Sequence, residues 1–426
     1  MTTSSIEDIV ISVPPIHNQH SGKRGDVVVV SSPAADDLSV DTAIRYSSYS
    51  PREDVHGVEL QITTATSGSS PTFSGTLSSS FPTKPRNLVC ILDDYHVDLD
   101  MPALYLSSQQ VIVHALDIRH DNEPVILTFM KDLKLFQTEL ESRIDLDTDH
   151  ILQVKRALVD SQGLPQSADF QSIRKLKVES MDNIMQDIYQ YLSQLLTRTI
   201  HSDTASTSPK SFDLKYPYVL CQESYDTTLA KFMNHNSMMN ISTIRKIVRD
   251  VVTGLISIHS ENRIHAKLNP KTIVRVGSRW KLKDLYSSVL LGQTCEISHL
   301  NMAHSPPEVA QGFVNAKTDY TYLADTTYDL WSLGCVIFHL IKGSPIWNSN
   351  AHGNISQTDL MHLAQWSPQQ FLNQAQLYLS PDGRRSDDER AVLDLLSRLL
   401  MPTPQDRIEF FPFGYVELKE CLPFYP

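Results

Sequence analysis

Four polar side chains around one expected hairpin could take part in chemistry. His265 and Lys267 precede the hairpin, Thr272 begins it and Asp284 follows it. Two short runs of alternating apolar residues on either side of a Gly-Ser turn at residues 276–279 predict the hairpin itself. Asp284 offers a carboxylate and Thr272 a neutral hydroxyl. The Lys267 ammonium cannot accept a proton while it is charged, so this set is poorly suited to general-base chemistry.

The stretch resembles the catalytic loop and the metal-binding loop of eukaryotic protein kinases, which read H-R-D-L-x-x-x-N and D-F-G. His265, Leu268 and Pro270 stand where the family has its His, Leu and Pro. Asp284 stands where the family has its metal-binding Asp. The resemblance implies that three positions carry the wrong side chains: Ala266 replaces the Arg, Lys267 the catalytic Asp, and Thr272 the metal-binding Asn.

Further motifs in the family's order extend the resemblance over residues 100–412. Ser305–Glu308 resembles A-P-E, and residues 329–334 match D-x-W-S-x-G. Arg407 resembles the late Arg that pairs with the Glu of A-P-E in this family. We therefore predict an α+β, two-lobed protein-kinase-like fold, with a small antiparallel β lobe carrying one helix and a larger, mainly helical lobe.

The expected nucleotide side of the small lobe also departs from the family. The strand at 124–130 resembles V-A-I-K with Thr128 in the place of the ATP-binding Lys. Strand alternation puts Lys131 on the opposite face, so we favour Thr128 as the counterpart. The next helix carries Glu139 where the family has the partner of that Lys, and we expect it to be solvated, locally paired or left with a residual role. No glycine occurs from Met101 to Asp160, so the usual close grip on phosphates is missing.

Residues 216–222 predict the strand that leads into the hinge. Cys221 falls near the position that gates the adenine site, or it is a small buried hydrophobe. An insert at about residues 160–215 contains apolar residues at helical spacing, which predicts an amphipathic helix. The helix either packs on the small lobe, which we favour, or offers its apolar face to a partner. Ser242 is expected to cap the strong helix that follows.

Composition narrows the class of protein. The 426 residues are 41% hydrophobic, which is enough for a sizeable core, and the net charge of −12 argues against an electrostatic nucleic-acid binder. Five scattered cysteines without a C-x-x-C pair fit reduced thiols and give no zinc site. The N-terminus lacks the features of a signal peptide, and no apolar run is long enough to span a bilayer.

The expected organisation has three parts. Residues 1–84, rich in Ser and Thr, predict a disordered tail that is a candidate for phosphorylation or docking. Residues 85–222 are assigned to the kinase-like small lobe and residues 223–426 to the kinase-like large lobe. We expect a soluble protein of the cytoplasm or nucleus that acts through protein partners, without nucleic acid or membrane.

The motifs that remain are those of architecture, while the groups that would move a phosphoryl group are replaced. We predict a catalytically impaired pseudokinase that serves as a scaffold or allosteric regulator in signalling and needs no cofactor. The alternative is an unconventional Ser/Thr protein kinase that uses ATP with Mg²⁺, with Lys131 on the phosphates and Asp284 with Glu139 on the metal; a third is nucleotide binding without catalysis. We further hypothesise an ion pair between Lys267 and Asp284 in an emptied metal site.

Overall fold

The computed structural model describes part of the chain, all of it within one compact unit, Phe81–Pro426. The expected tail of residues 1–84 and much of the insert lie outside the described residues. The described residues are 87–101, 103–106, 109–161, 178–202, 215–236, 239–296, 300–316, 320–350, 352–376 and 387–410.

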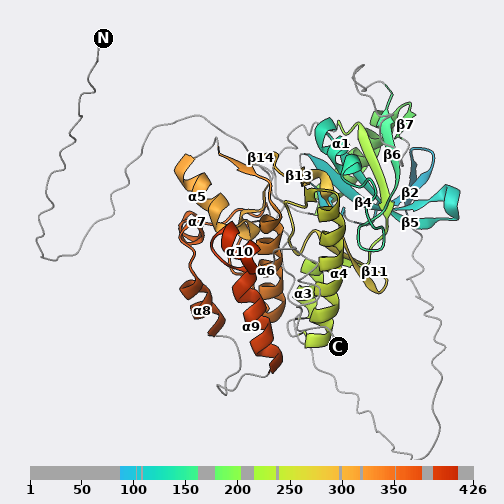
Figure 1. Cartoon of the computed structure of the whole chain (residues 1–426). Coiled ribbons are helices and arrows are strands. Elements are labelled where there is room, and N and C mark those ends of the chain that lie inside the picture. Colours follow the sequence, from blue (N-terminus) through green and yellow to red (C-terminus); the bar gives the residue numbers. More distant parts are fainter. Residues whose placement is uncertain are drawn as a thin grey trace, which may run out of the picture. The chain divides into compact units, whose positions relative to one another are not determined.

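The first lobe is built on an eight-stranded sheet with the order β1-β2-β4-β5-β8-β6-β7, and β3 pairs with β4 (Figure 1). Neighbouring strands of this sheet run antiparallel, except for β6 and β7, which run parallel to each other. The parallel strand comes from the insert and was not predicted. The strands are β1 Leu88–Ile91, β2 Tyr95–Asp98, β3 Tyr105–Leu106, β4 Gln110–Asp117, β5 Glu123–Met130, β6 Val154–Asp160, β7 Val178–Met181 and β8 Tyr218–Glu223.

The two faces of this sheet pack against different helices. Helix α2 (Ile184–Ser202) buries Ile188 and Leu192 against the face that carries Phe129 and Cys221. The favoured prediction for the insert helix, that it packs on the small lobe, is therefore confirmed. Helix α1 (Leu133–Glu141) buries its apolar residues on the opposite face, and its N-terminus is capped by Asp132. The small lobe thus carries both the helix of the predicted lobe and the predicted helix of the insert.

The second lobe is mainly helical, which confirms the predicted fold class (Figure 1). Its core surrounds α4 and the central helix α6, both almost wholly apolar on the sides that face each other. The helices are α3 Leu229–His235, α4 Ile241–Ser260, α5 Pro307–Ala316, α6 Thr326–Lys342, α7 Gln357–Ala364, α8 Pro368–Gln376, α9 Asp387–Leu399 and α10 Pro404–Phe410.

Short strands and turns connect these helices. The strands are β9 Thr227–Thr228, β10 Arg263–Ile264, β11 Ile273–Val276, β12 Arg279–Leu282, β13 Val289–Leu290, β14 Thr294–Glu296 and β15 Thr321–Leu323, and the 3-10 turns are η1 Ile118–His120, η3 Leu285–Ser287 and η5 Met302–His304.

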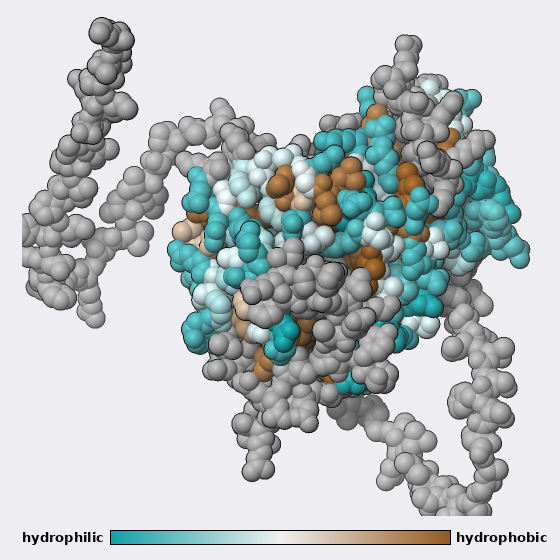
Figure 2. All heavy atoms as spheres, viewed as in Figure 1, coloured by the Kyte–Doolittle hydropathy of each residue, from teal (hydrophilic) through white to brown (hydrophobic). Residues whose placement is uncertain are grey.

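Figure 2 shows a mostly polar face of the molecule. Apolar side chains gather on it near the region that Figure 1 labels β13 and β14.

The cap of α4 differs from the prediction. Asn240, not Ser242, is the N-cap residue, because its side-chain oxygen accepts a hydrogen bond from the backbone N–H of Thr243 at 2.8 Å. The Ser242 hydroxyl donates to the same oxygen at 2.8 Å. Asn and Ser are about equally good caps, so the sequence alone did not separate them.

Candidate functional site

The expected hairpin brings the two candidate loops together. Strands β11 and β12 pair in antiparallel register, with Ile273 opposite Leu282, and the turn uses Gly277 at φ +57°. The pairing continues for one step, because the N–H of Lys283 donates to the carbonyl of Thr272 at 2.9 Å. Asp284 therefore follows directly after the hairpin, beside the loop that carries Lys267.

A buried aspartate at the start of the central helix holds the catalytic-loop backbone. The Asp329 carboxylate accepts the N–H of His265 at 2.7 Å and that of Ala266 at 3.1 Å. His265 is itself buried and contacts the carbonyl of Lys283 through Nε2 at 3.1 Å, and burial lowers the pKa of its imidazole. Ala266 has φ +59°, a conformation that costs free energy in a non-glycine residue and that the surrounding contacts must hold.

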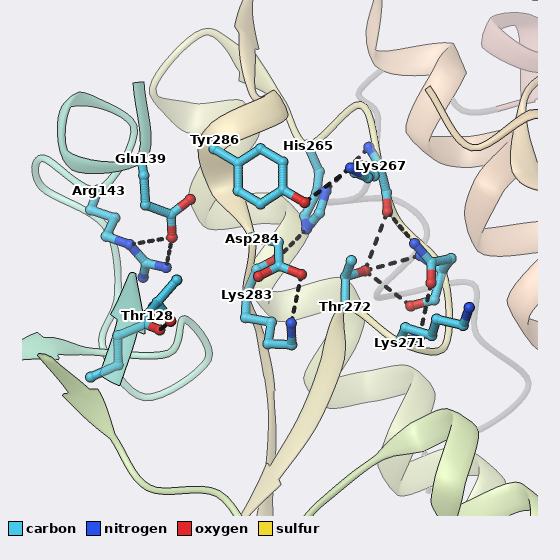
Figure 3. A network of polar contacts seen from close by, with 12 residues as sticks. Thr128, Glu139, Arg143, His265, Lys267, Lys271, Thr272, Lys283, Asp284 and Tyr286 are labelled. Carbon is cyan, nitrogen blue, oxygen red and sulfur yellow. Dashed lines mark hydrogen bonds and ion pairs between the residues drawn. The ribbon is translucent and has the colours of Figure 1, made fainter. Parts of the chain in front are cut away.

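The retained aspartate is already paired with a cation. The carboxylate of Asp284, which has φ +64°, lies 2.5 Å from Nζ of the adjacent Lys283 (Figure 3). Burial lowers the pKa of Lys283, but the attraction of Asp284, with smaller contributions from Tyr225 and Glu139, outweighs burial and leaves the pKa above its ordinary value. We hypothesised an ion pair between Asp284 and Lys267. The structure shows instead that the partner of Asp284 is Lys283.

Lys267 stands where the family has the catalytic Asp, and it contacts Tyr286 instead. Its Nζ donates to the Tyr286 hydroxyl at 3.0 Å and lies 4.6 Å from the centre of the ring. Burial lowers the pKa of Lys267; the attraction of Asp284 opposes this shift and the repulsion of Lys283 adds to it. Figure 3 shows the Tyr286 ring between Lys267 and Glu139.

Thr272, at the position of the metal-binding Asn, braces its own loop. Its hydroxyl accepts the N–H of Asn269 at 3.1 Å and lies within donating distance of the carbonyls of Asn269, at 3.0 Å, and Lys267, at 3.3 Å. The Asn269 amide donates to the Lys267 carbonyl as well, at 2.7 Å. A hydroxyl engaged in this way is poorly placed to serve as a metal ligand.

Thr128, at the position of the ATP-binding Lys, is buried in the sheet. Its hydroxyl donates to Oε1 of Gln222 on β8 at 3.0 Å. Lys131 lies with its ammonium 5.0 Å from the centre of the Tyr216 ring, and Tyr216 belongs to the core on the side of α2. Thr128 and Lys131 thus face opposite sides of the sheet, as strand alternation predicts.

Glu139 lies on α1 near Lys283 and is locally paired. Its Oε1 accepts from Nε of Arg143 at 3.1 Å and also forms an ion pair with the other end of that guanidinium. Arg143 donates to the carbonyl of Leu152 too. The second oxygen of Glu139 is buried and has no hydrogen-bond partner among the described residues. The arginine therefore supplies the charge partner that the replaced lysine would have been.

Cys221 does not face the nucleotide side. It lies opposite Leu127 on the neighbouring strand, in the core covered by α2, whereas Leu220 lies opposite Thr128. Of the two alternatives for Cys221, the small buried hydrophobe is therefore confirmed, and the residue does not gate the face that carries Thr128, because a one-residue step reverses the face of a strand side chain. Burial raises the pKa of its thiol, as expected for an inert buried cysteine.

An apolar cluster joins the two lobes. Its members come from both strands of the β4–β5 hairpin, from the segment before β6, from the segment after β8 and from β11, and each is less than a tenth exposed. Burial raises the pKa of the tyrosine among them, whose ring therefore stays neutral. The buried members are Ile112, Ile126, Leu152, Tyr225 and Val274.

The framework pair implied by the resemblance is present. Arg407 on α10 is fully buried and forms an ion pair with Glu308 at the start of α5, while its Nη1 donates to the Met401 carbonyl at 2.6 Å. In the part of the chain that the structure describes, no group of three or more His, Cys, Asp or Glu side chains could hold a metal ion. Among the same residues, no helix is long and apolar enough to cross a membrane.

Sequence reasoning missed three residues of the site. Lys283 immediately precedes Asp284, so its charge was visible, but its direction was not. Tyr286 stands two residues after Asp284, and its contact with Lys267 depends on a side-chain direction that the sequence does not give. Tyr225 gave no signal, because a single aromatic residue after a strand is common.

Comparison with known proteins identifies relatives of this chain. A sequence model described as the protein kinase domain matches residues 165–413. Thr128 and Glu139 precede that matched segment. A glycogen synthase kinase-3 homolog of Saccharomyces cerevisiae is 28% identical over 33% of this chain and 36% of its own length.

Two further relatives match about half of the chain. The serine/threonine-protein kinase PLK4 of Drosophila melanogaster is 24% identical over 50% of this chain and 24% of its own length. A probable cell division protein kinase of Encephalitozoon cuniculi is 26% identical over 51% of this chain and 71% of its own length. The chain thus spans well under two thirds of the length of the first two relatives.

Proposed function

Because this chain belongs to the eukaryotic protein kinase superfamily, we propose that it is a catalytically impaired member that acts as a scaffold or allosteric regulator of protein partners. The observation that carries the proposal is the ion pair between Lys283 and Asp284, 2.5 Å apart. Phosphoryl transfer in this family needs metal ions that bridge the phosphates and neutralise their developing charge. A metal-binding carboxylate already neutralised by a buried ammonium is a weak ligand for Mg²⁺.

The other chemical positions support the same proposal. Lys267 puts a cation where a proton acceptor is needed, and the Thr272 hydroxyl is engaged within its loop. Thr128 offers no charge to the phosphates. Transition-state stabilisation in such sites is mainly electrostatic, so reversing or removing several charges should abolish most of the rate.

The adenine side supports it independently. The five buried members of the apolar cluster pack on one another across the two lobes. A nucleotide base would have to displace Tyr225 and its neighbours before it could stack there. That rearrangement would expose apolar surface to water and lower nucleotide affinity.

Thermal melting of the full chain tests the proposal. ATP or ADP at millimolar concentration, with and without Mg²⁺ or Mn²⁺, should leave the midpoint unchanged, because a ligand raises it only by binding the folded form. A metal-dependent rise of the midpoint would contradict the proposal. A phosphotransfer assay would then follow, with Asp284→Ala as the control for activity that depends on the site.

Lys283 also favours a second candidate function, an unconventional Ser/Thr protein kinase that uses ATP with Mg²⁺. Its ammonium pairs with the retained Asp284 and is also attracted by Glu139, so in this function it contacts phosphates in place of the missing strand lysine. In that case Lys283→Met should abolish both the metal-dependent shift and any phosphotransfer. Under the first proposal, the wild type shows neither a metal-dependent shift nor phosphotransfer, so the substitution abolishes nothing.

A further inference from the structure

Lys267 is a largely buried cation without a carboxylate of its own. Among the described residues, no Asp or Glu forms an ion pair with its Nζ, and its hydrogen bond goes to the neutral hydroxyl of Tyr286. Asp284, the carboxylate that attracts it, is already paired with Lys283. Buried charges in proteins are normally paired, so an ammonium in this state is suited to an anionic ligand.

The carboxylates near Lys267 are already engaged with other groups. Asp284 pairs with Lys283 and Glu139 with Arg143, while Asp329 accepts the backbone N–H groups of His265 and Ala266 and contacts His259. The ammonium of Lys267 is therefore left without a carboxylate partner among the described residues. Such a site repels divalent cations and attracts oxyanions.

A neutral donor next to Lys267 suits the same ligand. The Tyr286 hydroxyl lies 3.0 Å from Nζ of Lys267 and accepts a hydrogen bond from it. With its oxygen accepting from Lys267, the phenol retains its own O–H as a donor.

We propose that Lys267 and the Tyr286 hydroxyl form an oxyanion site that binds a phosphate monoester without metal. The ligand is a phosphorylated Ser or Thr of a partner protein, which would enter on the side where kinases receive the hydroxyl of their substrate. In a kinase the catalytic Asp would repel the phosphorylated product from this position, whereas Lys267 attracts it. The altered site would thus recognise what an active kinase makes.

Two observations favour a polypeptide over a nucleotide as the source of the phosphate. The apolar cluster that contains Tyr225 occupies the adenine side, so in this respect the inference rests on the proposed function. The loop of Lys267 also carries Lys271, whose backbone N–H is held by Asn269 and whose exposed side chain adds positive charge on the substrate side.

The test uses the full chain in EDTA, with thermal melting and calorimetry. The probes are inorganic phosphate, the tripeptide Ala-phosphoserine-Ala with its unphosphorylated form, and ATP. We expect the phosphopeptide to raise the midpoint and its unphosphorylated form to have no effect. Lys267→Met should weaken phosphopeptide binding at least tenfold, and Lys246→Met, which removes an exposed lysine on α4, should leave it unchanged. No binding to the wild type, or equal binding to Lys267→Met, would overturn the site.

A second measurement does not depend on the folding of a variant. Competitive acetylation of the wild type, read at Lys267 by mass spectrometry across pH, reports the protonation of that amine. A bound phosphate stabilises the ammonium, so the phosphopeptide should slow labelling and move its pH dependence upward. Unchanged labelling would contradict the proposal.

The results with the different probes distinguish a failure of the oxyanion site from a failure of the proposed function. If metal-free ATP protects Lys267 from acetylation and the phosphopeptide does not, the ligand is not a phosphorylated protein. The same result would also contradict the claim that the apolar cluster excludes a nucleotide base. Failure of every metal-free probe, with no response to ATP and Mg²⁺ either, would overturn the oxyanion site and leave the proposed function standing.

Discussion

Two retained aspartates, Asp329 and Asp284, lie in very different surroundings. Asp329 is fully buried and accepts hydrogen bonds from two backbone N–H groups, while His259 contacts it at 3.0 Å. Asp284 keeps its position in the motif, but its carboxylate is taken by Lys283. The first aspartate holds the backbone of the loop, and the carboxylate of the second pairs with an ammonium. A retained residue type therefore does not imply a retained role.

The same contrast separates the framework from the site as a whole. Glu308 and Arg407 form the ion pair that the motifs implied. Within the site, Lys267, Thr272 and Thr128 stand at altered positions, and each side chain has a new partner. Substitutions in the framework should therefore destabilise the fold, whereas substitutions in the site should have small effects, or effects of the opposite sign.

The largest effect is expected for Asp329→Ala. Losing this carboxylate leaves the buried N–H groups of His265 and Ala266 without an acceptor, which should lower the free energy of unfolding by about 3–5 kcal/mol. Urea denaturation measures it. The control is Asp226→Ala, which removes a half-exposed carboxylate 3.4 Å from Arg275 and should cost less than about 1 kcal/mol. Equal losses in the two variants would contradict the framework role.

Acid should destabilise the framework through His304. Burial, with repulsion from His339 and Lys271, lowers the pKa of His304 from 6.5 to about 3. Between those values the unfolded chain binds a proton that the folded chain does not, so stability falls as the pH falls, by about 1.4 kcal/mol per pH unit from this group. Urea unfolding at pH 4, 5, 6 and 7 should show a shallower dependence for His304→Gln. His362→Gln, at an exposed residue on α7, serves as the control and should keep the wild-type slope.

Lys283→Met should have a smaller effect on stability and a diagnostic one on metal binding. It leaves the Asp284 carboxylate, which is 20% exposed, without its cation, and we expect a loss of about 1–3 kcal/mol in the free energy of unfolding. The freed carboxylate should let millimolar Mg²⁺ or Mn²⁺ raise the melting midpoint of the variant but not of the wild type. Lys281→Met removes the neighbouring ion pair with Glu223 and should gain no response to metal. A response in both variants, or in neither, would contradict the idea that Lys283 occupies the metal position.

The smallest effect, with the opposite sign, is expected for Lys267→Met. Methionine keeps the contact with the Tyr286 ring and removes a buried charge that has no carboxylate partner, so stability at pH 7 should stay the same or rise by up to about 1 kcal/mol. Because the pKa of Lys267 is lowered in the folded state, the wild type is relieved of this charge as the pH rises toward 10.5. The advantage of the variant should therefore shrink between pH 7 and pH 9.5 in urea unfolding. A loss like that of Asp329→Ala would place Lys267 in the framework instead.

The sequence predicted most of the architecture because its signals are local. Helical spacing in the insert predicted a helix with a face to bury, and that face packs on the sheet. The motif at Asp329 and the pair of Glu308 with Arg407 lie in stretches whose spacing follows the family. The sequence left alternatives open where one residue decides a direction, as at Cys221, and the prediction was wrong where two good caps compete, as at Asn240 and Ser242.

The sequence by itself determined the order of the elements and which chemical positions lack their usual side chains, since both follow from residue types at fixed spacings. Only the tertiary structure decided which charges meet. Asp284 leaves the extended strand in a left-handed conformation, and its carboxylate thereby meets the ammonium of its own neighbour, Lys283. The direction of a side chain depends on the backbone angles at a single residue and on the groups packed around it, and residue spacing carries neither.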